Sequence, residues 1–154
     1  MQNRFVRRCA VFVLLSAGFS LVSAQSNERL DVLLTQDPAE TGHAAYLILT
    51  AADILPEDSS PDEAYQAAVE AGWVAPDSSS TEPIEFGSFS HLFMEAFDVS
   101  GGVMYRVFPG PRYAAREVVY QEWSRTRRSP GERLSGDATV RILSVFLNQR
   151  GGVQ

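Results

Sequence analysis

Lysine is absent from this sequence, and cysteine occurs only once, at Cys9. Cys9 precedes the segment expected to form the mature chain, so disulfide bonds and thiol catalysis are excluded from that chain. Histidine is also scarce. His43 and His91 have no second histidine, cysteine or carboxylate at the spacing of metal ligands, so neither a metal site nor a cofactor is expected. A domain of this kind depends on its hydrophobic core alone.

Residues 1–24 have the layout of a secretory signal peptide. Three arginines precede an apolar run from Cys9 to Val22, and small residues up to Ala24 close the segment. The run is shorter than the roughly 20 apolar residues that span a bilayer, which favours cleavage after Ala24 over a retained anchor. The sequence therefore predicts an exported protein, periplasmic or at the cell surface, with no integral membrane span after cleavage and one domain over residues 25–154.

The charges of the remaining chain are unevenly distributed. Residues 25–100 contain 15 acidic side chains and one arginine, a balance of −14, whereas residues 101–154 contain nine arginines and four acidic side chains, a balance of +5. The favoured interpretation is that the two halves attract each other within one domain, and the alternative is a dedicated binding polarity. The overall acidity argues against nucleic acid as a partner, because phosphate contacts require a basic surface.

Two segments of the chain nearly repeat each other. Residues 38–54 and 83–99 share Pro, Glu, Gly, Leu, Ala and Asp at equivalent places, and such repeats indicate stacked supersecondary units. In the second segment the apolar residues lie at the spacing of one helix face: Phe89, Leu92, Phe93, Ala96 and Phe97. The same offsets start at Ala44 and, near the C-terminus, at Thr139, where the last member is Leu147.

Each of these helices is expected to have a partner helix upstream. Ser60, Pro61 and Glu63 form a capping-box pattern, and Gly72 marks the end of the helix that it begins. Similar apolar spacing ends at Trp123 in the third unit and starts at Leu30 in the first. The sequence therefore predicts a mainly α fold of three helix-loop-helix units, at about residues 28–55, 60–99 and 112–148.

Residues 101–113 interrupt the repeat. Paired glycines and a Pro-Gly-Pro sequence predict a connector with fixed turns, in which residues 103–107 are a candidate short strand. Its aromatic rings and guanidinium groups suit stacking on sugars or pairing with carboxylate or phosphate. The candidate ligand-binding residues are Tyr105, Arg106, Arg112 and Tyr113. In the alternative interpretation, the aromatic rings close the end of the core and the arginines pair with the acidic half.

A second basic segment follows at Arg125-Thr-Arg-Arg128. Such a cluster is suited to contact an anionic polymer or lipid, and the alternative is a solvated loop. Trp73 and Trp123, at the ends of their helices, are expected to pack in the core.

Residues 62–73, together with Pro83, Ile84, Gly87 and the helix of residues 89–97, resemble the S-layer homology module. In that family a helix ending in Gly, a loop, a Pro-Ile-like step and a second helix ending in Ala-Phe form one unit, and three units commonly pack around a pseudo-threefold axis. The resemblance implies a non-catalytic module that binds cell-wall polysaccharide. The family's Thr-Arg-Ala-Glu-like binding step is replaced by residues 85–88, Glu-Phe-Gly-Ser, so the resemblance supports the scaffold better than the sugar-binding role.

The sequence thus predicts an exported, non-enzymatic protein of the cell envelope that binds a cell-wall polysaccharide or another envelope component through residues 101–113 and the neighbouring arginines. The alternative is a structural or accessory protein whose partner is another envelope protein. A hydrolase of envelope polymers is the least favoured class, because neither a nucleophile nor an acid–base pair is recognisable.

Overall fold

The computed structural model describes residues 27–151, and the expected signal peptide lies outside this range. Most of the described chain is helical, and this part has no strand beyond two isolated β-bridges. Residues 27–35 are helical, and the helices that follow are α2 (Thr41–Ala51), α3 (Pro61–Glu70), α4 (Phe86–Ala96), α5 (Val103–Val107), α6 (Pro111–Tyr120) and α7 (Gly136–Gly151). The mainly α fold class is therefore confirmed. Between residues 27 and 151 no helix is long and apolar enough to cross a membrane.

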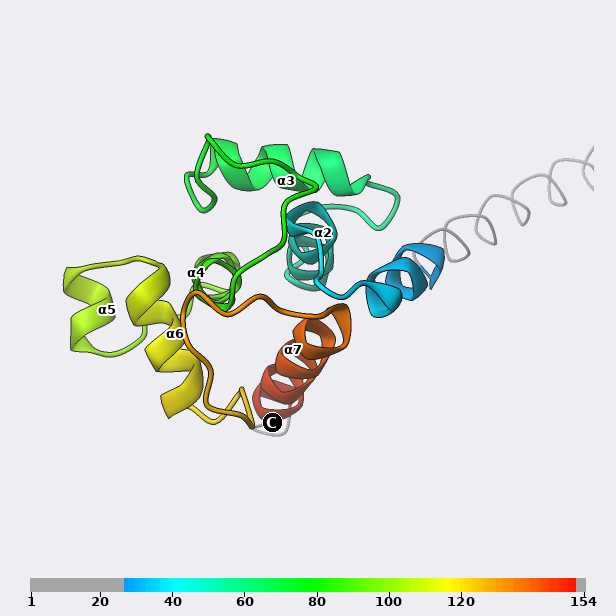
Figure 1. Cartoon of the computed structure of the whole chain (residues 1–154). Helices are drawn as coiled ribbons and strands as arrows, with labels where there is room; N and C mark the ends of the chain where they lie inside the picture. Colours follow the sequence, from blue (N-terminus) through cyan, green and yellow to red (C-terminus); the bar gives the residue numbers. More distant parts are fainter. Residues whose placement is uncertain (1–26, 152–154) are drawn as a thin grey trace, which may run out of the picture.

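Three helices surround the middle of the molecule (Figure 1). These are α2, α4 and α7, and α2 contacts both of the others. α3 lies across α2, and α6 packs against α4, with α5 beside it at the edge of the molecule. Each of the outer helices α3 and α6 therefore packs on the central helix that precedes it in the chain, and not on the one that follows it.

The connectors before α2, α4 and α7 meet in a closed ring of three backbone hydrogen bonds. The amide of Ala39 donates to the carbonyl of Leu134 at 2.7 Å, that of Ile84 donates to Ala39 at 2.9 Å, and that of Leu134 donates to Ile84 at 3.0 Å. All three residues are buried. Each unit thus donates to one neighbour and accepts from the other, as expected for three related units arranged around a common axis.

The backbone of each central helix starts close to another part of the chain. The amide of Gly42 donates to the carbonyl of Ser80, and that of Gly87 donates to the carbonyl of Pro130, both at 2.7 Å. An added side chain at either glycine would press on the backbone of these residues. This close approach accounts for the glycine that the two sequence repeats share. In the third unit an added Cβ at Gly136 would lie 1.7 Å from the carbonyl oxygen of Leu33, so helix 27–35 packs directly on the start of α7.

The outer helices α3 and α6 are built alike. Each begins with proline in its first turn, and each ends at a residue with left-handed backbone, Gly72 or Glu122, which a tryptophan follows. The capping box predicted at α3 is confirmed: the amide of Ser60 donates to the Glu63 carboxylate at 2.6 Å, and the amide of Glu63 donates to the Ser60 hydroxyl at 3.2 Å.

Aromatic side chains fill the core between α4, α6 and α7. The ring of Phe93 lies 5.5 Å from those of Phe97 and Trp123 and 4.7 Å from that of Phe146, centroid to centroid. The other members of the apolar stripes predicted for the three central helices are buried or half-buried, with one exception. Leu147, expected in the stripe of α7, is exposed, so that part of the prediction is wrong.

The segment considered as a short strand is the five-residue helix α5. Its amides donate to carbonyls four residues earlier, as Arg106 does to Gly102 at 3.1 Å. In the described chain it has no neighbouring strand with which to form a ladder, so its backbone groups are satisfied within a helical turn instead. Tyr105 is the one residue of α5 that is buried.

Replacing Gly136 with alanine should destabilise the fold. The new methyl group would collide with the carbonyl of Leu33, and helix 27–35 would have to move off α7, at a cost of about 2 kcal/mol. Urea unfolding followed by circular dichroism measures the loss. Gly131→Ala is the matched control, because Gly131 has open space around its Cα and lies in the connector before α7. Equal stabilities of the two variants would contradict the close packing.

Replacing Glu122 with glycine should stabilise the protein. Glu122 has a φ of 60°, a left-handed conformation that glycine adopts at its counterpart, Gly72. Relief of the strain should raise the free energy of unfolding by about 0.5–1 kcal/mol. Glu122→Gln removes the charge but retains the strained backbone, so its urea midpoint should match that of the wild type. If Glu122→Gln raised the urea midpoint as much as Glu122→Gly, the gain would come from the lost charge and not from the relieved backbone.

Candidate functional site

The four candidate ligand-binding residues of the 101–113 connector do not converge on one cavity. Tyr105 is buried, whereas Arg106 and Arg112 are exposed, and Tyr113 is half-buried and stacks on Phe108 with a centroid distance of 6.3 Å. Arg106 lines a small cavity of about 210 Å³, and Tyr113 lines a separate groove beside α6. Tyr105 borders both spaces, and Arg112 borders neither.

Tyr105 connects α5 to α4 through polar contacts. Its hydroxyl donates to Oε1 of Glu95 at 2.6 Å and lies 3.0 Å from Nδ1 of His91. Because the single phenolic proton is directed at the carboxylate, Nδ1 of His91 has to supply the proton of the second bond. The result is a chain of hydrogen bonds from His91 through Tyr105 to Glu95.

Burial and the nearby carboxylate of Glu95 shift the pKa values of Tyr105 and His91. Burial raises the pKa of Tyr105 far above its usual value, and the hydrogen bond to Glu95 raises it further. Burial lowers the pKa of His91, an effect that the charge of Glu95 opposes. Near neutral pH, Tyr105 is therefore an uncharged donor. Through these contacts, the buried face of α5 anchors the 101–113 connector on α4.

A larger groove, which we call the arginine groove, lies between α6, the connector 121–135 and α7. Its volume is about 860 Å³, and it is open to solvent on one side. Four arginines line it together with one carboxylate, Glu122. The lining residues are Ala115, Arg116, Val119, Tyr120, Glu122, Ser124, Arg125, Arg127, Arg128, Pro130, Val145 and Gln149. The groove is therefore basic, with apolar walls from both helices.

Most of these arginines are not paired with acids. In residues 27–151, Arg128 pairs with Glu132, whereas Arg116, Arg125 and Arg127 form no ion pair. Each ion pair in that range joins residues three or four positions apart, and none connects residues 25–100 with residues 101–154. No ion pair of the kind that the alternative interpretation expects is present in this range, and Arg116, Arg125 and Arg127 are exposed to solvent.

The floor of the groove is fixed by the core. Nε1 of Trp123 donates to Oε1 of Gln149 at 2.9 Å, which ties the connector to α7. The Trp123 ring packs on Phe93 and Phe146. The hydroxyl of Ser124, a buried residue, donates to the carbonyl of Thr126 at 2.7 Å, so the chain turns sharply between the arginines. The arginine side chains thus extend from a backbone that is held in place.

The connectors before α4 and α7 share backbone hydrogen bonds at their ends and differ between them. At the start, the amides of Trp73 and Trp123 donate to the carbonyls of Ala68 and Val118. Between the ends, the amide of Ser78 donates to the carbonyl of Ala75 at 3.2 Å, whereas residues 125–128 form no such turn. In residues 71–85 and 121–135, a serine amide donates to the glutamate side chain three residues later, at 3.2 Å for Ser79 and 3.4 Å for Ser129. The amides of both glutamates, in turn, donate to the serine carbonyls. A groove of about 590 Å³ borders residues 71–85.

The arginines distinguish the two connectors. Aligned without gaps, the first connector has Ala75, Asp77 and Ser78 where the second has Arg125, Arg127 and Arg128. The shared ends of the two connectors therefore form without these arginines.

The basic segment 125–128 was visible in the sequence, but two other contributions to the groove were not. Arg116 belongs to α6 and comes near the segment only through helix packing, and the wall of Val145 and Gln149 comes from α7. A sequence signal for Arg116 existed in its spacing of four from Arg112 and Tyr120, which places all three on one face of a helix.

No protein-family model, curated protein or solved structure matches this chain significantly. The resemblance to S-layer homology modules therefore rests on the residues quoted above. Between residues 27 and 151 no group of three or more His, Cys, Asp or Glu side chains is placed to hold a metal ion.

Replacing Tyr105 with phenylalanine should loosen α5. Both hydrogen bonds to the hydroxyl are lost, and the free energy of unfolding should fall by about 1–2 kcal/mol. Hydrogen exchange of the Arg106 amide, which closes the turn of α5, should become faster. Tyr120→Phe is the matched control, because that ring is 80% exposed and its hydroxyl has no hydrogen bond to the described residues. Similar urea midpoints for the two variants would contradict an anchoring role.

Proposed function

We propose that this protein is an exported, non-enzymatic module of the cell envelope that binds an anionic envelope component, such as an acidic cell-wall polysaccharide, in the arginine groove. The observation that carries the proposal is the open groove lined by Arg116, Arg125 and Arg127, none of which forms an ion pair within residues 27–151. Planar guanidinium groups bind carboxylate and phosphate groups through paired hydrogen bonds.

The shape of the groove suits a polymer better than a small molecule. It is open along one side, and Val119 and Val145 supply apolar surface between the charges. A second cavity of about 530 Å³ continues around the connector and shares Arg125 and Arg128 with the groove. A chain with repeated anionic groups can therefore contact arginines on both sides of the connector. Tyr120, at the edge of the groove, offers a ring on which a sugar can stack.

The chemistry of the groove supports binding without catalysis. Hydrolysis of a glycosidic bond commonly uses two carboxyl groups on either side of the bond. Glu122 is the single carboxylate that lines the arginine groove, so a second carboxyl group to pair with it is missing there. The resemblance to the S-layer homology module and the signal-peptide layout of residues 1–24 both agree with a binding role in the envelope.

Removing single arginines from the groove should weaken retention on purified cell-wall sacculi. Arg125→Gln and Arg127→Gln should each reduce retention roughly tenfold, because each removes charge-assisted hydrogen bonds. Retention of the wild type should also decrease as salt is added. The assay is a pull-down in which bound and free protein are quantified at several protein concentrations.

Arg133→Gln is the matched control for this experiment. It removes the same charge from an exposed residue of the same connector, and Arg133 does not line the groove. Retention of this variant should equal that of the wild type. If Arg133→Gln and Arg125→Gln lose retention equally, or if the wild type is not retained at all, the groove is not the binding site.

A further inference from the structure

The cavity that continues around the connector from the arginine groove has a different lining. It is the space of about 530 Å³ lined by residues of the connector and of α7, and we call it the α7 cavity. Arg125 and Arg128 border both this cavity and the arginine groove. The two spaces therefore meet at one short stretch of chain, and a single extended ligand can occupy both.

Acidic side chains neutralise most of the arginines of the α7 cavity. Nε of Arg141 pairs with Oδ2 of Asp137 at 2.8 Å, and both residues line the cavity. Arg128 pairs with Glu132. Within residues 27–151, Arg125 is thus the one arginine of this lining without an ion pair, whereas three such arginines line the arginine groove. The arginine groove favours an anionic group, and the α7 cavity does so much less.

Neutral polar groups take the place of charge in the α7 cavity. Thr126 and Asn148 are exposed there, and neither side chain forms a hydrogen bond to the described residues. The hydroxyl of Ser144 donates to the carbonyl of Val140 at 2.8 Å, which leaves its oxygen able to accept. A carboxamide and two hydroxyl groups offer both donors and acceptors to a ligand. This combination suits the hydroxyl and acetamido groups of an uncharged sugar.

Apolar side chains complete the wall of the α7 cavity. Val140 and Val145 are half-buried and line it beside the polar groups. A sugar ring presents C–H groups on its faces and hydroxyl groups around its edge. A lining of apolar surface with a few polar groups that fix orientation is therefore appropriate for such a ring.

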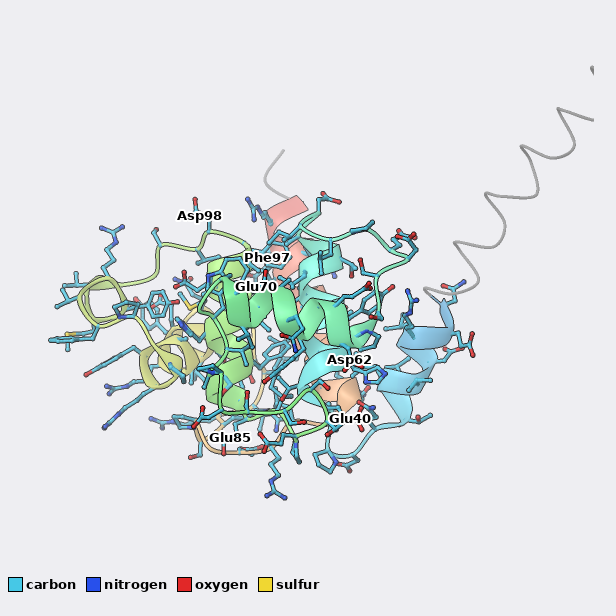
Figure 2. The ribbon with its side chains drawn as sticks, turned by 90° about the horizontal axis from the view of Figure 1, so that it is seen from above. Glu40, Asp62, Glu70, Glu85, Phe97 and Asp98 are labelled. Atoms are coloured by element: carbon cyan, nitrogen blue, oxygen red, sulfur yellow. The ribbon has the colours of Figure 1, made fainter. Side chains whose placement is uncertain are left out.

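The acidic half of the chain does not contribute to either cavity. No residue of 27–100 lines the arginine groove or the α7 cavity. In Figure 1, α3 lies on one side of the helix assembly, and α6 and α7 lie on the other. Asp62 and Glu70, two of the acids labelled in Figure 2, belong to α3. The charge of the two cavities is therefore determined by the residues that line them.

We propose that the polymer bound by this protein alternates acidic and uncharged sugar units. This inference rests on the proposed function, because it describes the ligand of the same groove. The acid group of one unit binds Arg125 and Arg127 in the arginine groove, and the next, uncharged unit occupies the α7 cavity beside Thr126 and Asn148. A polymer with an acid group on every unit would instead place a second anion next to Asp137.

Isothermal titration calorimetry on protein prepared by expressing the full chain tests this proposal. One probe is a hyaluronan fragment, in which glucuronate alternates with uncharged N-acetylglucosamine. The other is an oligogalacturonate with the same number of carboxylates, in which every unit is charged. The hyaluronan fragment should bind at least about tenfold more tightly, because its uncharged units add hydrogen bonds in the α7 cavity.

Variants of the α7 cavity separate this contribution from fragment length. Asn148→Leu and Thr126→Val remove polar groups with little change in size, and each should weaken binding of the hyaluronan fragment roughly fivefold. Neither should change binding of the oligogalacturonate, whereas Arg125→Gln should weaken binding of both. Asn27→Leu is the matched control, because Asn27 is exposed and lines neither cavity. Circular dichroism should show the same helical spectrum for all four variants.

The outcomes distinguish this inference from the proposed function. Equal affinity of the wild type for the two probes would overturn the alternation but not anionic binding in the groove. The same conclusion would follow if Asn148→Leu and Thr126→Val bound the hyaluronan fragment as tightly as the wild type. Binding of neither probe would also overturn the inference, and retention on sacculi would then show whether the proposed function fails with it.

Discussion

The fold depends on the ring of three backbone hydrogen bonds at Ala39, Ile84 and Leu134. All three residues are buried, and a buried amide or carbonyl left without a partner costs about 1–3 kcal/mol. Each of the three connectors donates to one neighbour and accepts from the other, so displacing any one of them breaks two bonds. The ring therefore fixes the starts of α2, α4 and α7 together. The arginine groove depends on this geometry, because α6 and the connector form one wall and α7 forms the other.

Much of the helical structure could be predicted from local sequence. The stripe around Phe93 has the helical period, and the capping box at Ser60 specifies the start of α3. The ring could not be predicted, because its bonds join backbone groups of residues far apart in the chain. Every residue type carries the same amide and carbonyl groups, so the pattern of side chains does not indicate which of them pair. The helical state of α5 was also missed. Its apolar residues read as a short strand, and only the missing partner strand and the Tyr105 anchor determine its conformation.

The candidate site could be predicted only in part, because some of its residues come together through packing of distant segments. Arginines at 125, 127 and 128 stand out as a cluster, whereas Arg116 joins them only through the packing of α6. The sequence also suggested the rings and guanidinium groups of the 101–113 connector as one site. A five-residue helix points neighbouring side chains in different directions, so Tyr105 enters the core while Arg106 faces solvent.

The ring and the contact of Gly136 with Leu33 join the two ends of the described chain. A chain that emerges amino end first, from a ribosome or through a translocation channel, therefore cannot complete its core until the residues beyond Leu134 are free. Contacts of such high sequence separation slow folding. A topology closed by its last helix thus delays completion of the core until the residues of that helix are available.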